Sequence, residues 1–258
     1  MAWLQIQSPG VLTADPSATS IALAFTSNVT SGHLIVAVAC WSNAAAENAS
    51  CSDTLGTSYS RVQTPGTWDT TGQYGCQVFY GVAPSGGSNT VTINNYGGTS
   101  ASRAFRLLAI YEFSGNNSSS LLNQSKFLAN VGGATGTDGM SSGSATTTGN
   151  GCLIFGIEQA CRSGSPGTAS AGTGFTAGVT SGAYLYLSEY RTQTTAGSVA
   201  STFTHSIGGN TWIEGYAAFN PAGASGGTVT AVAAAASAAI PTSGGAVEVD
   251  VDLSYAVH

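Results

Sequence analysis

The sequence predicts an all-β fold: an antiparallel sandwich of two sheets, with a jelly roll as the best-matching topology and an extended arm at the C-terminus. Two observations carry this prediction. Short runs rich in β-branched and aromatic residues recur between clusters of Gly, Ser, Asn and Pro. No segment shows a hydrophobic period of 3.6 residues with capping signals, and only one helical turn is expected, within Ser118–Asn130.

Ten strands are expected along the chain. Two of them, His33–Trp41 and the run from Cys152 to Ile157, are nearly continuous apolar runs, which indicates central strands covered on both faces. No internal repeat is visible in the pattern. The expected strands are Trp3–Gln7, Ser20–Thr26, His33–Trp41, Gly75–Val82, Asn89–Asn94, Arg103–Phe113, Gly151–Gln159, Tyr184–Arg191, Val199–His205 and Thr211–Phe219.

The composition is typical of a protein of an exterior surface. Only 7% of residues are charged, against about 25% in an ordinary soluble domain. Hydroxyls, amides and 35 glycines carry the polarity instead, and Lys126 is the only lysine. A net charge of −6 leaves no basic patch for nucleic acid or for anionic membranes, so neither partner is expected. The longest apolar run is too short to span a bilayer.

The N-terminal residues have no positively charged region followed by an apolar one, so they do not resemble a signal peptide. An exterior composition without a signal peptide favours a virion protein, because virions assemble in the cytoplasm and leave by lysis. The alternative is a mature extracellular domain to which Met1 was added.

The C-terminal residues change in texture after Pro221. Residues 1–221 are expected to form the sandwich, residues 222–245 an Ala/Gly/Ser/Thr linker, and residues 246–258 an arm with strict alternation. An amphipathic strand on a tether of about 25–30 Å needs a sheet edge to pair with, in its own sandwich or in a neighbour's. The apolar face of the arm consists of Val247, Val249, Val251, Leu253, Tyr255 and Val257.

The five cysteines are an odd number, so at least one lies outside any intramolecular pairing. Cys40 and Cys51 flank a loop that a disulfide would close. Cys152 and Cys161 bracket one strand of about 30 Å, too long for them to pair with each other, since a disulfide spans about 4.4–6.8 Å between Cα atoms. The candidate disulfide residues are Cys40, Cys51, Cys76 and Cys161, with buried thiols as the alternative. No Cys/His spacing indicates a metal site.

No catalytic constellation is expected, and no cofactor. The histidines lie in no known motif, and Asp53, in Ser-Asp-Thr-Leu-Gly, reads as a turn residue that caps backbone N–H groups. A glycosidase pair formed in space, for example Glu112 with Glu214, is the enzymatic alternative. The acids are otherwise expected at the surface or beside Arg103, Arg106 or Arg191. They are Asp53, Asp69, Glu112, Glu158, Glu189 and Glu214.

Four aromatic residues are candidates for stacking on sugar rings: Trp68, Tyr74, Tyr184 and Tyr186. An exposed Trp or Tyr offers a sugar a flat apolar face with a polar edge. The alternative is that these rings fill the core or a contact between subunits.

An ordered series of motifs resembles a widespread bacterial and phage β-sandwich domain. The series runs over residues 20–221 through "SGHLIVAVACWSN", "CSDTLGTSYSRV", "CQVFYGVAPSGGSNTVTIN", "LLAIYEFSG", "NGCLIFGIEQA", "GTGFTAG" and "WIEGYAAFNP". The resemblance implies a concanavalin-like or jelly-roll module of extracellular or phage structural proteins, and it brings no catalytic residues.

The sequence therefore favours a non-catalytic virion structural protein, a capsid decoration protein that assembles with copies of itself and with a capsid or other structural protein through its arm. The alternative is an extracellular or cell-surface module that binds glycans or mediates adhesion, polymerised into a filament by strand donation.

Overall fold

The computed structural model describes residues 3–14, 19–42, 49–63, 67–68, 74–94, 106–131, 138–161, 168–181, 186–206 and 211–223. All sheets in these residues are antiparallel and no helix occurs among them, so the predicted all-β class is confirmed. Residues 1–226 form one compact unit. The predicted linker, except Ala222 and Gly223, and the predicted arm lie outside the described residues.

The first half of the chain forms two sheets, which we name the N-inner and N-outer sheets. The N-inner sheet has the order β1 (Leu4–Gln7), β10 (Arg106–Ser114), β4 (Leu34–Ser42), β8 (Tyr74–Val82) and β6 (Ser60–Arg61), with β2 (Val11–Ala14) beside β10 and β7 (Thr67–Trp68) beside β8. The N-outer sheet has the order β3 (Ser20–Ala24), β9 (Thr90–Asn94) and β5 (Ser50–Asp53).

The second half forms the C-inner and C-outer sheets. The C-inner sheet has the order β11 (Leu122–Val131), β20 (Thr211–Phe219), β14 (Cys152–Cys161), β17 (Tyr186–Gln193) and β16 (Thr176–Ser181). The C-outer sheet has the order β12 (Asp138–Ser141), β19 (Thr202–His205) and β15 (Ala169–Ala171), and a short ribbon pairs β13 (Ala145–Thr146) with β18 (Ser198–Val199).

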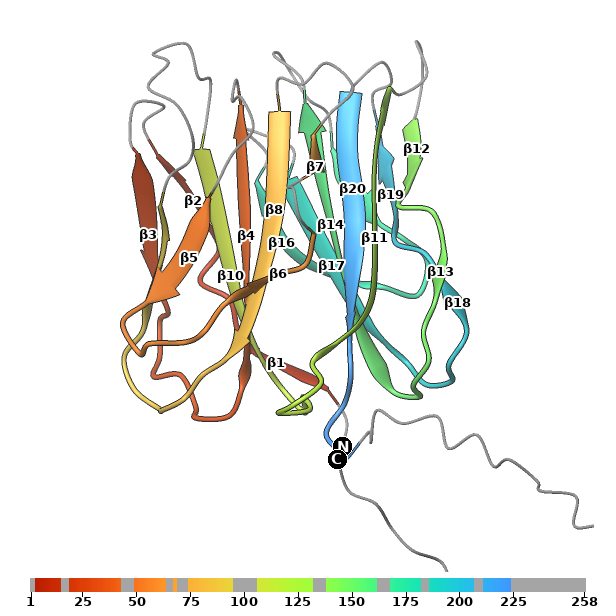
Figure 1. Ribbon diagram of the computed structural model, residues 1–258. Coiled ribbons are helices and arrows are strands. Elements are labelled where there is room, and N and C mark those ends of the chain that lie inside the picture. Colours follow the sequence, from red (N-terminus) through yellow and green to blue (C-terminus); the bar gives the residue numbers. More distant parts are fainter. Residues whose placement is uncertain are drawn as a thin grey trace, which may run out of the picture. The chain divides into compact units, whose positions relative to one another are not determined.

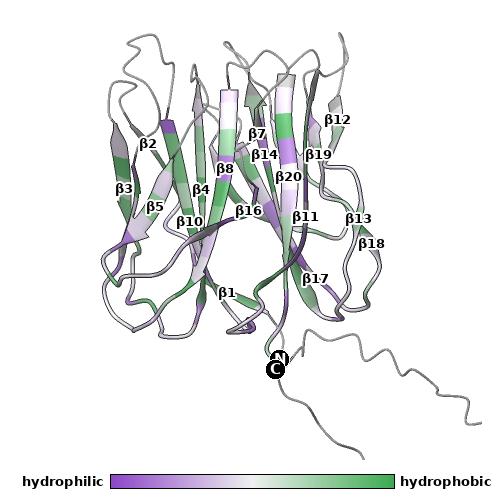
Figure 2. Ribbon diagram, in the orientation of Figure 1, coloured by the Kyte–Doolittle hydropathy of each residue, from purple (hydrophilic) through white to green (hydrophobic). Residues whose placement is uncertain are grey.

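The sheets stack in four layers, with the two inner sheets face to face in the middle (Figure 1). The central core lies between the inner sheets and takes alternate residues from both, among them Val36 and Tyr111 from the first half and Phe155 and Ile213 from the second. The opposite face of each inner sheet packs against its own outer sheet. Figure 2 shows the resulting apolar strands, with hydrophilic bands within β8 and β20 and a hydrophilic end on β10.

The predicted single sandwich of two sheets is therefore too simple, because the described residues form two inner and two outer sheets. The continuous run in β4 is buried on both faces, as the apolar pattern predicts: every residue from Leu34 to Trp41 is at most 1% exposed. A sandwich of two sheets covers only one face of each strand. Strands buried on both faces require further layers, and the two outer sheets supply them.

The two halves repeat one topology. Replacing β1, β10, β4, β8 and β6 by β11, β20, β14, β17 and β16 converts the order of one inner sheet into that of the other, and the outer sheets correspond in the same way. Register agrees as well. Leu34 pairs with Val82 and Phe113, and Leu153 pairs with Thr192 and Phe219.

Local backbone conformation supports the repeat. A glycine of positive φ lies two residues before Leu34 and two residues before Leu153; these glycines are Gly32 (φ 83) and Gly151 (φ 75). The halves also exchange contacts symmetrically, because β2 lies against β16 and β7 lies against β11. The repeat is not visible in the sequence because few of the equivalent residues are identical.

All ten predicted strands exist, each within a few residues of the predicted bounds. The helical turn predicted in Ser118–Asn130 is wrong, since most of this stretch belongs to β11. Phe127 and Ala129 pack against the central core while Lys126 and Leu128 are exposed, which is the alternation of an edge strand.

Candidate functional site

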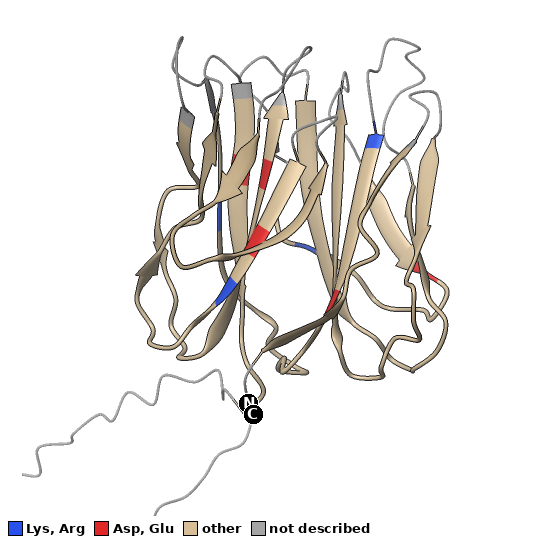
Figure 3. Cartoon of the chain, turned by 180° about the vertical axis from the view of Figure 1, so that it is seen from behind, with Lys and Arg blue, Asp and Glu red and all other residues tan. Residues whose placement is uncertain are grey.

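Four of the chain's carboxylates lie fully buried in the strands: Glu112, Glu158, Glu189 and Glu214 are each 0% exposed. The expectation of a surface position is wrong for these four acids, and of the arginines expected as alternative partners Arg191 acts on Glu189. Figure 3 shows how few charged residues the strands carry. Four buried carboxylates are therefore a large share of the charged groups in the strands. Their signal in the sequence is an acid inside an apolar run, as in "CLIFGIEQA" and "WIEGYAAF". Ionised groups are rarely buried without a partner, so each needs an account.

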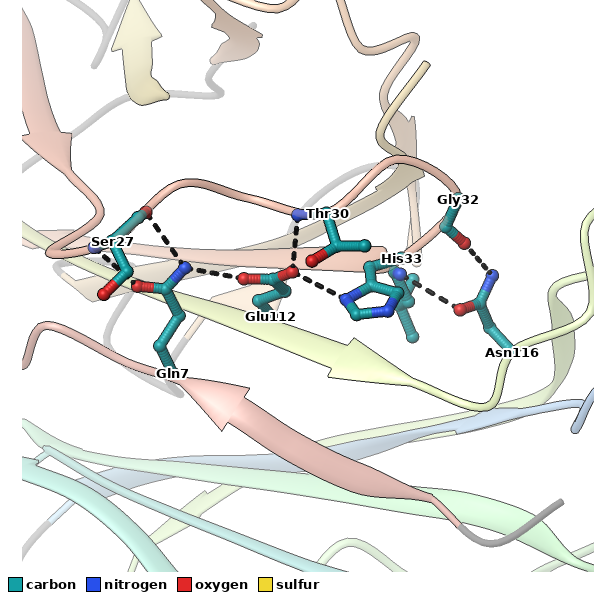
Figure 4. A network of polar contacts seen from close by, with 8 residues as sticks. Gln7, Ser27, Thr30, Gly32, His33, Glu112 and Asn116 are labelled. Carbon is teal, nitrogen blue, oxygen red and sulfur yellow. Dashed lines mark hydrogen bonds and ion pairs between the residues drawn. The ribbon is translucent and has the colours of Figure 1, made fainter. Parts of the chain in front are cut away.

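Glu112 links several segments of the first half through hydrogen bonds (Figure 4). Its Oε1 accepts a hydrogen bond from the Thr30 N–H at 2.9 Å and lies 2.6 Å from His33 Nδ1, while its Oε2 accepts from Gln7 Nε2 at 2.6 Å. These bonds tie β10 to β1 and to the turn before β4. Beside them, Asn116 accepts from the Leu34 N–H at 3.1 Å. The carboxylate is fully engaged, so this network is a structural clamp.

The other three buried acids gather on the outer face of the C-inner sheet. Glu158 on β14 and Glu214 on β20 are register partners, and Glu189 on β17 stands opposite Gly156, two residues before Glu158. From the C-outer sheet, His205 Nε2 lies 2.9 Å from Glu158 Oε2, and His205 is also 0% exposed. We call Glu158, Glu189, Glu214 and His205 the acidic cluster.

The pair suggested by the sequence, Glu112 with Glu214, does not form. Glu112 belongs to the clamp on the first half, and the register partner of Glu214 is Glu158. Two carboxyl groups do meet in space, but they are those of Glu158 and Glu214.

Hydrogen bonding within the acidic cluster is uneven. Glu189 is well engaged: Oε1 accepts from Ser201 Oγ at 2.8 Å and from the Thr202 N–H at 3.2 Å, and Oε2 accepts from the Gly172 N–H at 2.7 Å. Glu214 has no hydrogen bond of standard geometry at either oxygen, and Glu158 Oε1 and His205 Nδ1 also have none. The Ser142 backbone and the Ser201 hydroxyl act to lower the pKa of Glu214, so a buried charge on Glu214 would be only partly compensated.

Burial raises the pKa of all three carboxyl groups. Burial and the neighbouring Glu189 and Glu158 raise the pKa of Glu214 to about 9. Burial raises the pKa of Glu158 to about 7, although the bond to His205 opposes the rise. Burial also raises the pKa of Glu189, against the hydrogen bonds that it accepts. The arrangement therefore retains protons in a range of pH in which ordinary carboxyl groups are ionised.

The acidic cluster offers no exposed carboxylate to a substrate. Among the described residues no group of three or more His, Cys, Asp or Glu side chains could hold a metal ion. What the cluster can do chemically is to bind and release protons.

Asp53 caps the turn that follows β5, as the sequence predicts. Its Oδ1 accepts from the N–H groups of Leu55 at 3.1 Å and Thr57 at 2.9 Å. Its Oδ2 accepts from Tyr59 Oη and Asn89 Nδ2, each at 2.9 Å. Burial acts to raise the pKa of Asp53, but these hydrogen bonds outweigh it and hold the pKa below its usual value.

The cysteines are arranged differently from the loop-closing pair Cys40–Cys51. Cys40 on β4 and Cys76 on β8 are register partners in the central core, with Sγ atoms 3.1 Å apart. Cys51 packs on the opposite face of the N-inner sheet. The structure describes Cys40, Cys51, Cys76 and Cys152 as thiols. Cys152 and Cys161 are the two ends of β14, and the Cys161 side chain lies outside the described residues.

The candidate sugar-stacking residues do not form one surface. Tyr186 is 0% exposed and its hydroxyl lies 2.9 Å from that of Tyr111, so it is a core residue. Tyr74 is half-buried against the central core. The side chain of Trp68 and all of Tyr184 lie outside the described residues, as do the arm residues from Val247 to Val257.

The chain matches no family model, and no curated protein or solved structure is significantly similar to it. The described residues contain no helix that is long and apolar enough to cross a membrane.

The cysteine geometry predicts one disulfide. Refolding with oxidised glutathione should convert the Cys40 and Cys76 thiols to a disulfide, with two glutathione thiols released, because register partners in a sheet lie within disulfide range. Peptide mapping by mass spectrometry without reduction should find Cys40 linked to Cys76. C51S should keep this link and C76S should abolish it. A Cys40–Cys51 link would contradict the structure.

The clamp predicts a large effect of E112A. The substitution leaves Gln7, Thr30 and His33 without their acceptor, and we expect the free energy of unfolding to fall by about 3 kcal/mol. Urea unfolding followed by fluorescence measures it, with T204A on an exposed position of β19 as the control. Equal, small effects of both substitutions would show that the clamp contributes nothing.

Proposed function

We propose that this chain is a virion structural protein, a capsid surface protein that assembles through its C-terminal arm. The observation that carries the proposal is the position of the two ends of the described body. Leu4 pairs with Ser114, and the Ala222 N–H donates to the Gly115 carbonyl at 2.6 Å, so both ends lie beside the same turn (Figure 1). A body whose ends lie together is suited to attachment at one end and display at the other.

The strands beside the two ends of the described body include a sheet edge with which an arm could pair. β1 is an edge strand of the N-inner sheet. Of the large apolar side chains in the described residues, four are exposed, and three of them lie on β1 and β2: Leu4 at 61%, Ile6 at 41% and Leu12 at 37%. An edge with an apolar surface is what an amphipathic strand requires. The proposed occupant is the arm, residues 246–258, of a neighbouring copy.

The composition of the body also supports display rather than chemistry. Its buried carboxylates lie inside the layers, and hydroxyl and amide groups dominate the remaining polar residues. The resemblance to bacterial and phage β-sandwich modules agrees with the same proposal.

Deleting residues 246–258 should abolish self-assembly while leaving a folded monomer. Light scattering after size-exclusion chromatography measures the mass, and circular dichroism measures the fold. In the full-length chain, the double variant L4S/I6S should weaken assembly in the same way. L128S, which removes an exposed leucine from the edge strand of the other inner sheet, is the matched control and should not. An unchanged oligomeric state after the deletion would refute the proposal.

A further inference from the structure

Because the two halves repeat one topology, each residue of the acidic cluster can be compared with the residue at the equivalent position in the first half. Counting from the register partners Leu34 and Leu153, Glu158 occupies the position of Ala39 in the first half. Counting from Phe113 and Phe219, Glu214 occupies the position of Leu108.

The remaining two members follow in the same way. Glu189 lies three residues before Thr192 as Phe79 lies three before Val82. The carbonyls of Ser201 and Asn89 accept equivalent bonds from Ser142 and Phe25, which places His205 at the position of Ile93.

At the four equivalent positions the first half carries apolar side chains. Ala39, Phe79, Leu108 and Ile93 are at most 2% exposed and belong to one apolar cluster. The scaffold therefore does not need three carboxyl groups and an imidazole at these positions. Replacement of buried ionic groups by well-packed apolar residues is often neutral or stabilising, so the presence of these groups in the second half points to a role other than stability.

Few other ionisable groups face the cluster. Arg191 on β17 acts on Glu189 and stacks over the Phe175 ring, with its guanidinium carbon 4.4 Å from the ring centre. Directly after β12, Ser142 Oγ accepts a hydrogen bond from the Ser201 N–H at 3.0 Å, and on β12 the backbone of Asp138 lies opposite His205. The β11 residue opposite Glu214 is Leu128. The surrounding side chains are otherwise apolar: Met140, Leu187, Phe203 and Trp212.

Glu158 and Glu214 cannot both be ionised without cost. As register partners their Cα atoms are about 5 Å apart, in a layer from which water is excluded. Two like charges at such a distance raise the affinity of the pair for a proton. While the pair holds protons, neither of its two carboxyl groups is charged, and both can stay in the closed layer. When the protons leave for solvent, the charges repel and need water, which reaches them only if the outer sheet lifts.

We propose that the acidic cluster is a proton-binding site that holds the C-outer sheet in place, and that this sheet opens locally when the cluster loses its protons. The N-outer sheet, with apolar residues at the same positions, stays closed.

The stability of the C-outer sheet should fall as pH rises, because protonation and folding are linked. Carboxyl groups whose pKa is higher in the folded than in the unfolded state stabilise the fold fully below their unfolded pKa, and this stability is lost as pH rises through the folded pKa. With pKa values raised to about 7 for Glu158 and about 9 for Glu214, the loss runs from mildly acidic to mildly alkaline pH.

Hydrogen–deuterium exchange on the full chain tests the proposal, because the two outer sheets serve as site and control in one molecule. After correction for the intrinsic pH dependence of exchange, protection of β19 amides should fall with rising pH, by up to about tenfold per pH unit for each proton lost. Protection of β9 amides should stay constant. A parallel loss in both sheets, or a constant β19, would overturn the proposal.

Variants assign the effect to the cluster. E214L installs the residue found at the equivalent position, Leu108, and should remove most of the pH dependence of β19 protection. An infrared carbonyl band of protonated carboxylic acid should persist at neutral pH in the wild-type chain and weaken in E214L. If E214L does not fold, absence of that band from the wild-type chain would by itself refute the proposal, and pH dependence undiminished in a folded E214L would do so too.

Discussion

The face-to-face packing of the two inner sheets is the constraint on which the rest of the structure depends. It buries one face of every inner strand in a central core in which aromatic rings meet edge to face, as Tyr111 and Phe155 do at 4.8 Å between centroids. Polar groups enter this core only with partners: the Tyr111 hydroxyl donates to Ser188 Oγ at 2.8 Å. Each inner strand then has a second face, which would be exposed apolar surface without an outer sheet. The four layers follow from this requirement.

The two outer layers solve one packing problem in two ways. Around β9 the positions equivalent to the acidic cluster are apolar, although Arg106 and Gln77 are also buried in the first half. The buried carboxylate of this half is in the Glu112 clamp, and both there and in the Asp53 turn every carboxylate oxygen has a partner. Around β19 carboxyl groups enter the layer itself, and Glu158 and Glu214 have oxygens without a hydrogen bond of standard geometry. Because the scaffold is the same, the difference comes from side chains rather than from topology.

The strands could be predicted because each depends on a local pattern. The number of layers could not, although β4 carried the information: a run buried on both faces excludes a simple two-sheet sandwich, and only the pairing of distant strands shows what covers the second face. The repeat was hidden because equivalent positions share burial rather than identity, as with Ala39 and Glu158. Cys40 and Cys76 could not be paired from sequence since they are adjacent only through the register of β4 and β8.

The layered arrangement also explains how the second half can tolerate an outer sheet that opens at high pH. The C-inner strands are held from their other face by the central core, through residues such as Phe155, Ile213 and Phe219, whatever happens at the C-outer sheet. Both ends of the described body are tied at the turn that follows β10, through Leu4 and Ala222. Opening of the C-outer sheet would therefore leave the inner sheets paired and the exit of the C-terminal segment in place. Local stability can differ between the halves without loss of the whole fold, because each outer sheet depends on the inner layers while the inner layers depend chiefly on each other.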